Sequence, residues 1–269
     1  MPTDPLHERA TDSPSQPVTG IEAGADEAPE LSVVIPVHNE AANIRSLLDE
    51  VCAALRGRMR FEIVVVDDVS TDETPAILKA ARRDMRELRA LRHRQNAGQS
   101  MSVLSGVRSA RAPVIVTLDG DGQNDPADIP ALWQTLKSAP DGGRGLLLAG
   151  HRVHRRDSAI KRLSSKIANA VRSGLLGDAT PDTGCGVKML HRDLFLRLPA
   201  FDHMHRFLPA LVLRMGGQVR SVPVNHRPRG GGASHYGTWG RLKAGIVDMI
   251  GVIWLKRRWR DCGGINHLY

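Results

Sequence analysis

Short, almost continuously apolar runs rich in β-branched residues alternate with amphipathic stretches along much of this chain. Such runs are typical of strands buried on both faces of a parallel sheet, and the stretches between them have the length of helices. Strands that alternate with helices are joined by right-handed crossovers. The sequence therefore predicts an α/β fold with a mostly parallel, doubly wound sheet and helices on both faces. Strands are expected at residues 31–36, 61–67, 114–119, 145–150 and 219–224, and helices from near Ala41, Thr71, Gln99 and Pro126.

Composition places the chain among globular proteins. It has 269 residues, of which 41% are hydrophobic, and this is enough to bury a large core. Its three cysteines are widely spaced, so neither a disulfide scaffold nor a zinc site is supported, and a reducing cytosol is expected. Of the 37 basic residues, seven are lysine and the other 30 are arginine. Arginine suits phosphate and carboxylate partners, although a bias in codon composition explains the same excess.

The two ends of the chain differ from its middle. Residues 1–30 are acidic and rich in Pro, Ser, Thr and Gly, so we expect a disordered acidic tail there. The main domain is expected over residues 31–240. Residues 241–269 hold an apolar stretch at helical spacing that ends in a basic cluster and is too short to span a bilayer. This pattern predicts either an amphipathic helix at a membrane interface or a last helix packed on the sheet.

Polar residues follow three of the predicted strands. In open α/β sheets, ligands bind beyond the carboxyl ends of the strands, and here those ends hold residues 38–40, 67–72 and 119–125. Carboxylates crowded at adjacent strand ends repel one another unless a cation compensates them, and their oxygens suit Mg²⁺ or Mn²⁺. The sequence lacks the usual glycine-rich signatures of dinucleotide and phosphate-loop sites. We therefore expect a divalent-metal site that binds a nucleotide in another way.

Seven motifs occur along the chain in a fixed order: PVHNE (36–40), DDVSTDET (67–74), NAGQSMSVLSGV (96–107), LDGDGQNDP (118–126), GHR (150–152), DTGCGVKML (182–190) and RPRGGGASHYG (227–237). Each motif alone is weakly specific, whereas their order and spacing are strong. Together they resemble family 2 glycosyltransferases, and more narrowly the group of dolichyl-phosphate mannosyltransferases and undecaprenyl-phosphate sugar transferases. The resemblance runs from about Leu31 to Arg260 and implies a GT-A, Rossmann-like fold.

The resemblance also implies roles for individual residues. The residues that would border the nucleoside are Pro36, His38, Glu40, Val66 and Asp68. The residues that would lie along the diphosphate are Asp119, Gly120 and Asp121. The ligands of Mg²⁺ or Mn²⁺ would be Asp119, Asp121 and Gln123. Arg152 and Arg229 would neutralise phosphate charge and, with Asp121, form the catalytic set.

Two of these positions depart from the family's pattern. His38 stands where the family more often has tyrosine, so stacking on the base is not assured by the sequence. His235, which would contact the phosphates, stands where the family commonly has lysine. A positive contact at His235 therefore depends on pH.

The resemblance implies metal-dependent, inverting transfer of a sugar from a GDP- or UDP-linked donor to a polyprenyl phosphate. A phosphate monoester with a second pKa of about 6 attacks without a strong base, whereas a hydroxyl acceptor needs a positioned Asp or Glu. We expect peripheral attachment to the cytoplasmic face of the inner membrane and no nucleic-acid partner. Two alternatives stay open: a family 2 transferase acting on a lipid or saccharide hydroxyl, and a non-catalytic protein that binds an anionic membrane or nucleic acid.

Overall fold

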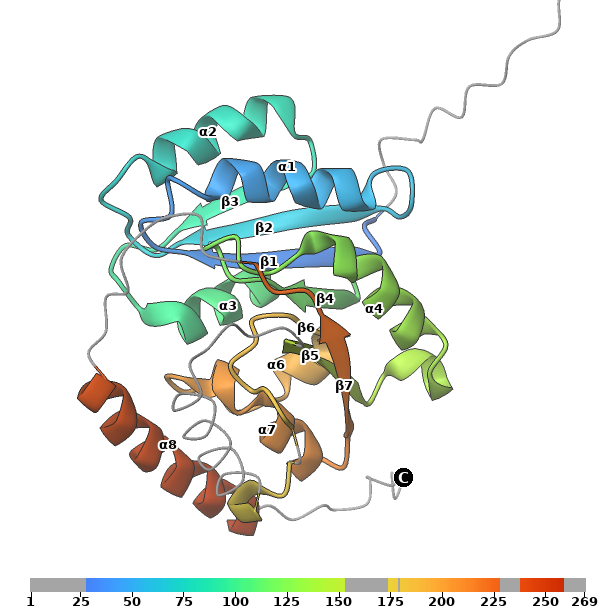
Figure 1. The fold of residues 1–269 in the computed structure, drawn as a ribbon, viewed down its shortest axis with the longest axis vertical. Helices are drawn as coiled ribbons and strands as arrows, with labels where there is room; N and C mark the ends of the chain where they lie inside the picture. The colour runs from blue at the N-terminus through green and yellow to red at the C-terminus, as the bar shows by residue number, and fades with distance from the viewer. Residues whose placement is uncertain (1–27, 153–173, 179, 228–237, 259–269) are drawn as a thin grey trace, which may run out of the picture.

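The structure, a computed structural model, describes residues 28–152, 174–178, 180–227 and 238–258 (Figure 1). Within this part of the chain, seven strands form one sheet in the order β3-β2-β1-β4-β6-β5-β7. Neighbouring strands are parallel except at β6, which runs antiparallel to β4 and β5. The strands are β1 (Leu31–Val37), β2 (Phe61–Asp67), β3 (Leu88–Arg92), β4 (Val114–Thr117), β5 (Leu146–Arg152), β6 (Lys188–His191) and β7 (Gln218–Val224).

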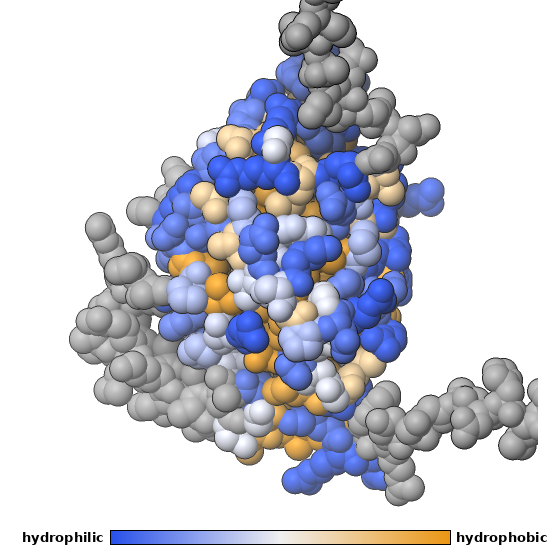
Figure 2. Space-filling model, turned by 90° about the vertical axis from the view of Figure 1, so that its right-hand side faces the viewer, coloured by the Kyte–Doolittle hydropathy of each residue, from blue (hydrophilic) through white to orange (hydrophobic). Residues whose placement is uncertain are grey.

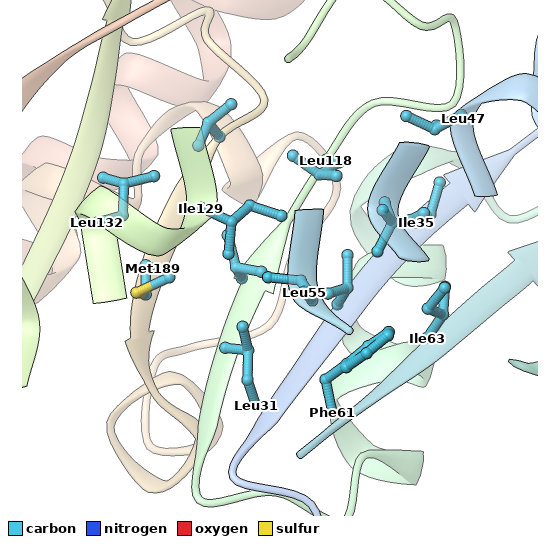
Figure 3. Packing of buried hydrophobic residues seen from close by; sticks show 14 of the residues in the cluster. Leu31, Ile35, Leu47, Leu55, Phe61, Ile63, Leu118, Ile129, Leu132 and Met189 are labelled. Atoms are coloured by element: carbon cyan, nitrogen blue, oxygen red, sulfur yellow. The ribbon is translucent and has the colours of Figure 1, made fainter. Parts of the chain in front are cut away.

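Three adjacent strands are buried on both faces, as their apolar sequences predict. Every residue of β1, β2 and β4 is buried. Side chains of β1 and β4 alternate between two hydrophobic cores, and β2 contributes Phe61, Ile63 and Val65 to the first; Figure 3 shows the packing of one such cluster. In β1, for example, Val33 and Ile35 belong to the first core and Val34 to the second. The predicted α/β fold with a mostly parallel sheet is confirmed.

Helices cover both faces of the sheet. Helices α1, α2 and α4 contribute to the first core, and α3, α6 and α7 contribute to the second. Helix α3 packs closely on β1 at Gly106. A Cβ at this position would come 2.5 Å from Cγ1 of Val34, so only glycine allows this approach. The bounds of these helices are α1 (Ile44–Leu55), α2 (Thr74–Asp84), α3 (Gly98–Ser109), α4 (Ile129–Lys137), α6 (Arg192–Leu196) and α7 (Leu208–Arg214).

Helices α1 and α2 begin later than the sequence predicts, because a polar side chain first holds the loops that precede them. The carboxylate of Asp72 accepts hydrogen bonds from the backbone N–H groups of Ala41 and Thr74, both at 3.0 Å. These amides are satisfied by the loop, and the helices begin at Ile44 and Thr74.

The sequence analysis does not predict two of the strands. Strand β3 contains two arginines among its five residues and is only partly buried, as expected at the edge of a sheet. Strand β6 has four residues and begins with the charged Lys188, so it lacks the long apolar run that marks the other strands. Its antiparallel insertion between β4 and β5 is the point where the sheet departs from parallel pairing.

Helix α8 (Thr238–Arg258) is the last described element, and it lies next to α7 along one side of the molecule (Figure 1). Its side chain Val252 is fully buried, and Met249 and Ile253 pack against the second core. Another set of apolar side chains stays exposed: Ile246, Val247, Ile250 and Trp254. One apolar side of the helix therefore packs against the second core, and another apolar side is exposed to solvent. Among the described helices, none combines the length and the hydropathy that a membrane span requires.

Candidate active site

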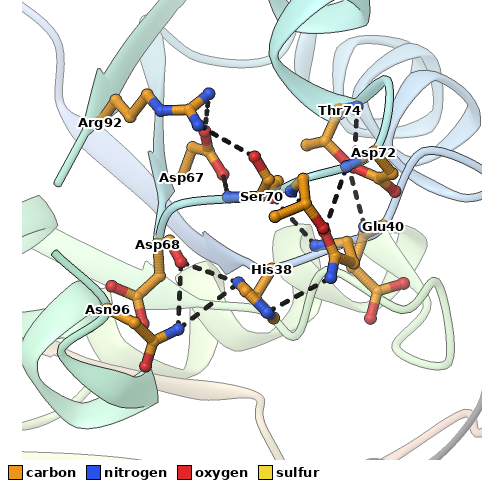
Figure 4. Close-up of polar contacts among 11 residues, drawn as sticks. His38, Glu40, Asp67, Asp68, Ser70, Asp72, Thr74, Arg92 and Asn96 are labelled. Atoms are coloured by element: carbon orange, nitrogen blue, oxygen red, sulfur yellow. Dashed lines mark hydrogen bonds and ion pairs between the residues drawn. The ribbon is translucent and has the colours of Figure 1, made fainter. Parts of the chain in front are cut away.

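The loops that follow β1 and β2 form one polar cradle at the carboxyl edge of the sheet (Figure 4). Asn39 accepts a hydrogen bond through its side-chain oxygen from the backbone N–H of Thr71 at 2.8 Å. Its own backbone N–H donates to Ser70 Oγ at 2.9 Å, and the N–H of Glu40 donates to Thr74 Oγ1 at 3.0 Å. These contacts join the two loops, so the protein forms the cradle without help from a ligand.

His38 is exposed in this cradle, at the position that the resemblance assigns to the nucleobase. Its Nδ1 lies 2.7 Å from the backbone oxygen of Asp68, so Nδ1 carries the proton and donates it. The side chain of Asn96 donates to the same oxygen at 3.2 Å, as Figure 4 shows. Pro36 and Val66 are register partners in β1 and β2, and both are buried. Of the predicted nucleoside residues, His38 and Glu40 thus present their side chains at the cradle, whereas Pro36 and Val66 pack within the sheet.

The carboxylate of Asp68 accepts hydrogen bonds from other groups of the protein. It accepts hydrogen bonds from the backbone N–H groups of Ala97 at 2.9 Å and Gly98 at 2.7 Å. It also accepts one from Nδ1 of His93 at 2.8 Å. Since the side chain is buried, its main role in the described structure is to fix the start of α3 against the end of β2. A contact between this carboxylate and a ribose stays a prediction.

The acids that follow β4 leave the sheet beside the cradle. Gly120 lies between them, and a Cβ there would come 2.7 Å from Val37 and 3.0 Å from the carbonyl oxygen of Pro36. Glycine is therefore required for the chain to approach β1 so closely. The close approach brings Asp119 and Asp121 to the same edge as the cradle.

Asp119 is strongly perturbed by its surroundings. One carboxylate oxygen accepts a hydrogen bond from Nε2 of Gln99 at 2.8 Å. Burial, and then repulsion from Asp121, raise the pKa of Asp119 to about 6, against a weaker opposing effect of Lys188 and Arg152. Within the described residues, no salt bridge of 4 Å or less joins Asp119 or Asp121 to a basic side chain. Among the described residues, no basic side chain therefore directly neutralises this pair of carboxylates.

Asp121 and Gln123 complete the predicted ligand set. The backbone N–H of Gln123 donates to Oδ1 of Asp121 at 3.1 Å, so the two residues share one tight turn. No group of three or more His, Cys, Asp or Glu side chains gathers as a metal cluster in the described ranges. Two carboxylates and one amide oxygen nevertheless fit Mg²⁺ or Mn²⁺, which keep several positions for water and substrate phosphate. The raised pKa of Asp119 favours a cation here, because a divalent charge would stabilise the ionised carboxylates.

Arg152 and Lys188 bring positive charge to the same edge. Arg152 ends β5, and the carboxylate of Asp182 accepts hydrogen bonds from its Nε at 2.6 Å and its Nη2 at 2.8 Å. Lys188 is only 3% exposed and donates to the carbonyl oxygen of Cys185 at 2.5 Å. Burial lowers the pKa of Lys188. Both cations act on Asp119 across the site, although neither contacts it directly.

The sequence analysis missed Gln99, Lys188 and His205 as residues of this site. All three line a cavity of about 20 Å³ beside Asp119, which is the size of one water molecule. Gln99 and Lys188 lie within motifs that carry the family resemblance, so those motifs held a signal for them. His205 lies in no such motif, and only the fold brings it beside Asp119.

Arg229 and His235, which were predicted to contact the phosphates, lie outside the described residues. Arg227, just before this segment, forms hydrogen bonds with the loop that holds the predicted metal ligands. The backbone N–H of Arg227 donates to the carbonyl oxygen of Gln123 at 3.0 Å, and its Nη2 donates to Asp125 at 2.6 Å. The described segment 180–227 therefore ends next to the predicted metal ligands.

Comparison with known proteins identifies the family. The protein-family model described as glycosyl transferase family 2 matches residues 32–198 of this chain. The chain is 33% identical over 234 residues to dodecaprenyl-phosphate galacturonate synthase of Rhizobium johnstonii, covering 85% of this chain and 68% of that protein. It is 35% identical over 222 residues to undecaprenyl-phosphate 4-deoxy-4-formamido-L-arabinose transferase of Pseudomonas paraeruginosa, covering 82% of this chain and 64% of the relative. The chain thus spans about two thirds of the length of these two relatives.

Solved structures share the fold. Glucosyl-3-phosphoglycerate synthase of Mycobacterium tuberculosis, in complex with Mn²⁺, UDP and glucosyl-3-phosphoglycerate, matches with a TM-score of 0.58 at 20% identity. The match covers 87% of this chain and 82% of the other. A complex of the same enzyme with Mg²⁺ and UDP matches with a TM-score of 0.57. The predicted GT-A fold and the predicted family are confirmed: this chain belongs to glycosyl transferase family 2.

Proposed function

We propose that this protein transfers a sugar from a nucleoside diphosphate sugar to a polyprenyl phosphate, with inversion at the anomeric carbon. Both relatives described above carry a polyprenyl phosphate in their names, and both match more than four fifths of this chain, at 85% and 82%. Their names support the same class of acceptor here. Membership of the family favours an enzyme over the non-catalytic binding protein that the sequence alone left open.

The environment of Asp119 and Asp121 is the observation that carries the proposal. The two carboxylates stand beside a preformed cradle, and burial together with repulsion from Asp121 raises the pKa of Asp119 to about 6. With Gln123, they would hold Mg²⁺ or Mn²⁺ together with the donor's diphosphate. When bound, the metal ion offsets the negative charge that accumulates on the leaving nucleoside diphosphate.

The chain's own cations support the same step. Asp182 holds the guanidinium of Arg152 through two hydrogen bonds, so the arginine has a fixed orientation at the edge of the site. In the transfer, an acceptor phosphate oxygen bonds to the anomeric carbon while the bond from that carbon to the diphosphate breaks. The nucleoside diphosphate leaves with the electron pair, and the configuration inverts. A phosphate dianion attacks without a strong general base. Asp182 is therefore not needed as a base, and its hydrogen bonds to Arg152 are compatible with a phosphate acceptor.

The exposed side of α8 supports peripheral attachment to a membrane. Its exposed apolar residues, with 47–67% of their surface accessible, are Ile246, Val247, Ile250 and Trp254. The last turn of the helix is basic, with Lys256, Arg257 and Arg258. An apolar strip with a basic end fits the interface of an anionic bilayer. The side of the molecule seen in Figure 2 is instead mainly hydrophilic, with apolar residues in small patches. We therefore place the cytoplasmic face of the membrane, and the lipid acceptor, on the α8 side.

Sugar transfer is tested by incubating the protein with Mn²⁺, vesicles that contain undecaprenyl phosphate, and a panel of UDP- and GDP-linked sugars labelled in the sugar. The expected product is extractable into organic solvent and releases its label in mild acid. Acid-stable label would indicate a hydroxyl acceptor and contradict the proposal, and so would label confined to the aqueous phase. A parallel reaction with EDTA should give no transfer.

A further inference from the structure

A short turn, residues 202–206, lies between α8 and the start of α3. It contains the 3-10 helix η3 (Met204–Arg206), and Met204 anchors it in the second core. Its two histidines reach different elements, since His203 contacts α8 and His205 contacts α3. The turn therefore links the helix with the exposed apolar side to a helix that borders the active site.

On the α8 side, His203 pairs with Asp248. Its Nδ1 lies 2.9 Å from Oδ2 of Asp248, and the Asp248 side chain is only 18% exposed. His203 has a φ of 61°, in the left-handed region that non-glycine residues seldom adopt. Its backbone N–H donates to Oδ1 of Asp202 at 2.7 Å, which helps to hold this conformation. An unfavourable backbone conformation is thus maintained at the residue that reaches α8.

On the α3 side, His205 binds Ser100. Ser100 Oγ lies 2.7 Å from Nδ1 of His205 and accepts a hydrogen bond from the backbone N–H of His205 at 3.2 Å. Burial lowers the pKa of His205 to about 3, so its ring is neutral near pH 7 and shares one hydrogen bond with the Ser100 hydroxyl. Asp202 also faces this helix, with an oxygen 3.7 Å from where a Cβ on Gly98 would stand.

The first turn of α3 holds carboxylates of both acidic loops. Gln99, the neighbour of Ser100, donates to Asp119 at 2.8 Å. One residue earlier, the backbone N–H of Gly98 donates to Asp68 at 2.7 Å. A shift of Ser100 therefore moves groups that bind Asp119 and Asp68, because all of them belong to one turn of helix.

We propose that His203 and His205 are positioning residues that couple the seating of α8 on a lipid bilayer to the orientation of Asp119. The inference rests on the proposed function, in which α8 faces the membrane and Asp119 binds the donor's diphosphate. With α8 seated, the turn holds Gln99 where it orients Asp119 for the nucleotide. Such coupling is reciprocal, so bound nucleotide strengthens membrane binding by the same factor by which the membrane strengthens nucleotide binding.

The test is calorimetric titration of the full chain with UDP and with GDP in the presence of Mn²⁺. Titrations are run with and without vesicles of phosphatidylethanolamine and phosphatidylglycerol that lack polyprenyl phosphate. For the nucleotide that binds, vesicles should tighten binding by about 5-fold or more. Saturating nucleotide should tighten vesicle binding, measured by sedimentation, by an equal factor.

Two variants of Asp248 separate coupling from membrane binding. Asp248→Ala removes the partner of His203 without altering the exposed side of α8, so vesicles should still bind while the gain in nucleotide affinity falls below about 2-fold. Asp248→Asn keeps an acceptor oxygen for His203 and should retain most of the gain. Arg214→Met is the matched control. It removes a hydrogen bond from α7 to the carbonyl oxygen of Leu255 in α8, and this contact does not involve the turn at residues 202–206. The control should keep the full gain.

The inference is overturned if Asp248→Ala binds vesicles and keeps the gain, or if the unmodified protein binds both ligands without any gain. A failure of the proposed function has another signature, namely no binding of either nucleotide or no binding of vesicles by the unmodified protein. If Asp248→Ala does not fold, hydrogen exchange of the unmodified protein decides the matter. The amides of Ala97 and Gly98 should then exchange more slowly when vesicles are added, and an unchanged rate contradicts the coupling.

Discussion

Strands β2 and β4 both lead into a pair of acids, and the two pairs have opposite environments. Asp67 lies 3.0 Å from Nη1 of Arg92, and Asp68 accepts three hydrogen bonds from groups within the protein. Asp119 and Asp121 have no ion pair of this kind among the described residues. Crowded acids in a sequence are therefore not by themselves evidence of a metal site. What distinguishes the second pair, within the described residues, is that no basic side chain forms an ion pair with it.

The energetic consequence differs between the two loops. The carboxylate of Asp68 accepts hydrogen bonds from two backbone amides and from His93, so these bonds contribute to the stability of the fold. For Asp119, burial and the neighbouring Asp121 raise the pKa to about 6, so its ionised form near pH 7 destabilises the metal-free protein. The first pair stabilises the scaffold, whereas the second retains an unfavourable charge that a cation would offset. Such a cost is expected where function, rather than stability, determines the residue.

The largest expected effect comes from the second pair. Asp121→Asn should lower kcat/KM for sugar transfer by about 10³-fold, or about 4 kcal/mol of transition-state stabilisation, because it removes a predicted metal ligand at the leaving group. Its free energy of unfolding should change little. Asp49→Asn, at an exposed acid on α1, is the control and should keep full activity. A near-normal rate for Asp121→Asn would remove this residue from the reaction.

The same substitution in the first pair should affect stability instead. Asp68→Asn should lower the free energy of unfolding by about 2 to 3 kcal/mol, because a carboxamide has one acceptor oxygen and its NH₂ group faces amide donors. Urea unfolding at pH 7.5 with EDTA measures the difference. If Asp68→Asn is as stable as the unmodified protein, the contrast between the two loops is wrong.

Asp119→Asn should stabilise the metal-free protein. The pKa of Asp119 is about 6 in the folded state and 3.8 as its ordinary value, so the folded state binds the proton more tightly than the unfolded state does. Stability is therefore lost as pH rises through this window, and the penalty is complete above about pH 6 and absent below about pH 4. Since the side chain is partly exposed, we expect a gain of about 1 to 2 kcal/mol at pH 7.5.

Urea unfolding with EDTA at pH 7.5 and near pH 4 checks both the size and the sign of this effect. The advantage of Asp119→Asn should shrink at the lower pH, where Asp119 of the unmodified protein is protonated. Saturating Mn²⁺ with UDP or GDP should reverse the order at pH 7.5, because a bound ligand stabilises only the protein that retains its site. An advantage that does not depend on pH would point to packing instead of charge.

The sequence predicts the acidic loops but not the difference between them. The partners of Asp68 lie 25 to 30 residues further along the chain, in His93 and at the start of α3, so only the fold shows that its charge is satisfied. The same limit applies to His205, which lies 105 residues from Ser100. Local patterns specify residue types at strand ends, whereas charge compensation depends on tertiary contacts.

The strands show the same division. The sequence predicts β1, β2, β4, β5 and β7 because each contains a run of apolar or β-branched residues. It does not predict β3 and β6, since β3 is a half-exposed edge strand and β6 holds the buried Lys188. The charge of Lys188 is tolerated there because carbonyl oxygens of the preceding turn accept its hydrogen bonds. A sequence pattern based on hydropathy therefore omits the strand that carries a buried cation to the site.

The smallest expected effect concerns the backbone of the two loops. Val69, after the first pair, has a φ of 62°, and Gly122, after the second, has a φ of 72°. A β-branched residue in this region costs about 1 to 2 kcal/mol, whereas glycine costs about 0.5 to 1 kcal/mol through the entropy of the unfolded chain. Val69→Gly should therefore raise the free energy of unfolding by less than about 1 kcal/mol, and Gly122→Val should lower it by at least as much.

Nucleotide affinity gives these two variants a second measurement. Val69 stands between Asp68 and Ser70, whose contacts form the cradle, so the strained residue limits how far this loop can move. If that restriction prepares the cradle for the nucleoside, Val69→Gly gains stability but binds UDP or GDP with Mn²⁺ more weakly, by about 2- to 5-fold. If affinity is unchanged, the strain at Val69 contributes nothing to binding, and the preformed cradle depends on its hydrogen bonds alone. Either result shows whether the β2 loop, like the β4 loop, gives up stability for function.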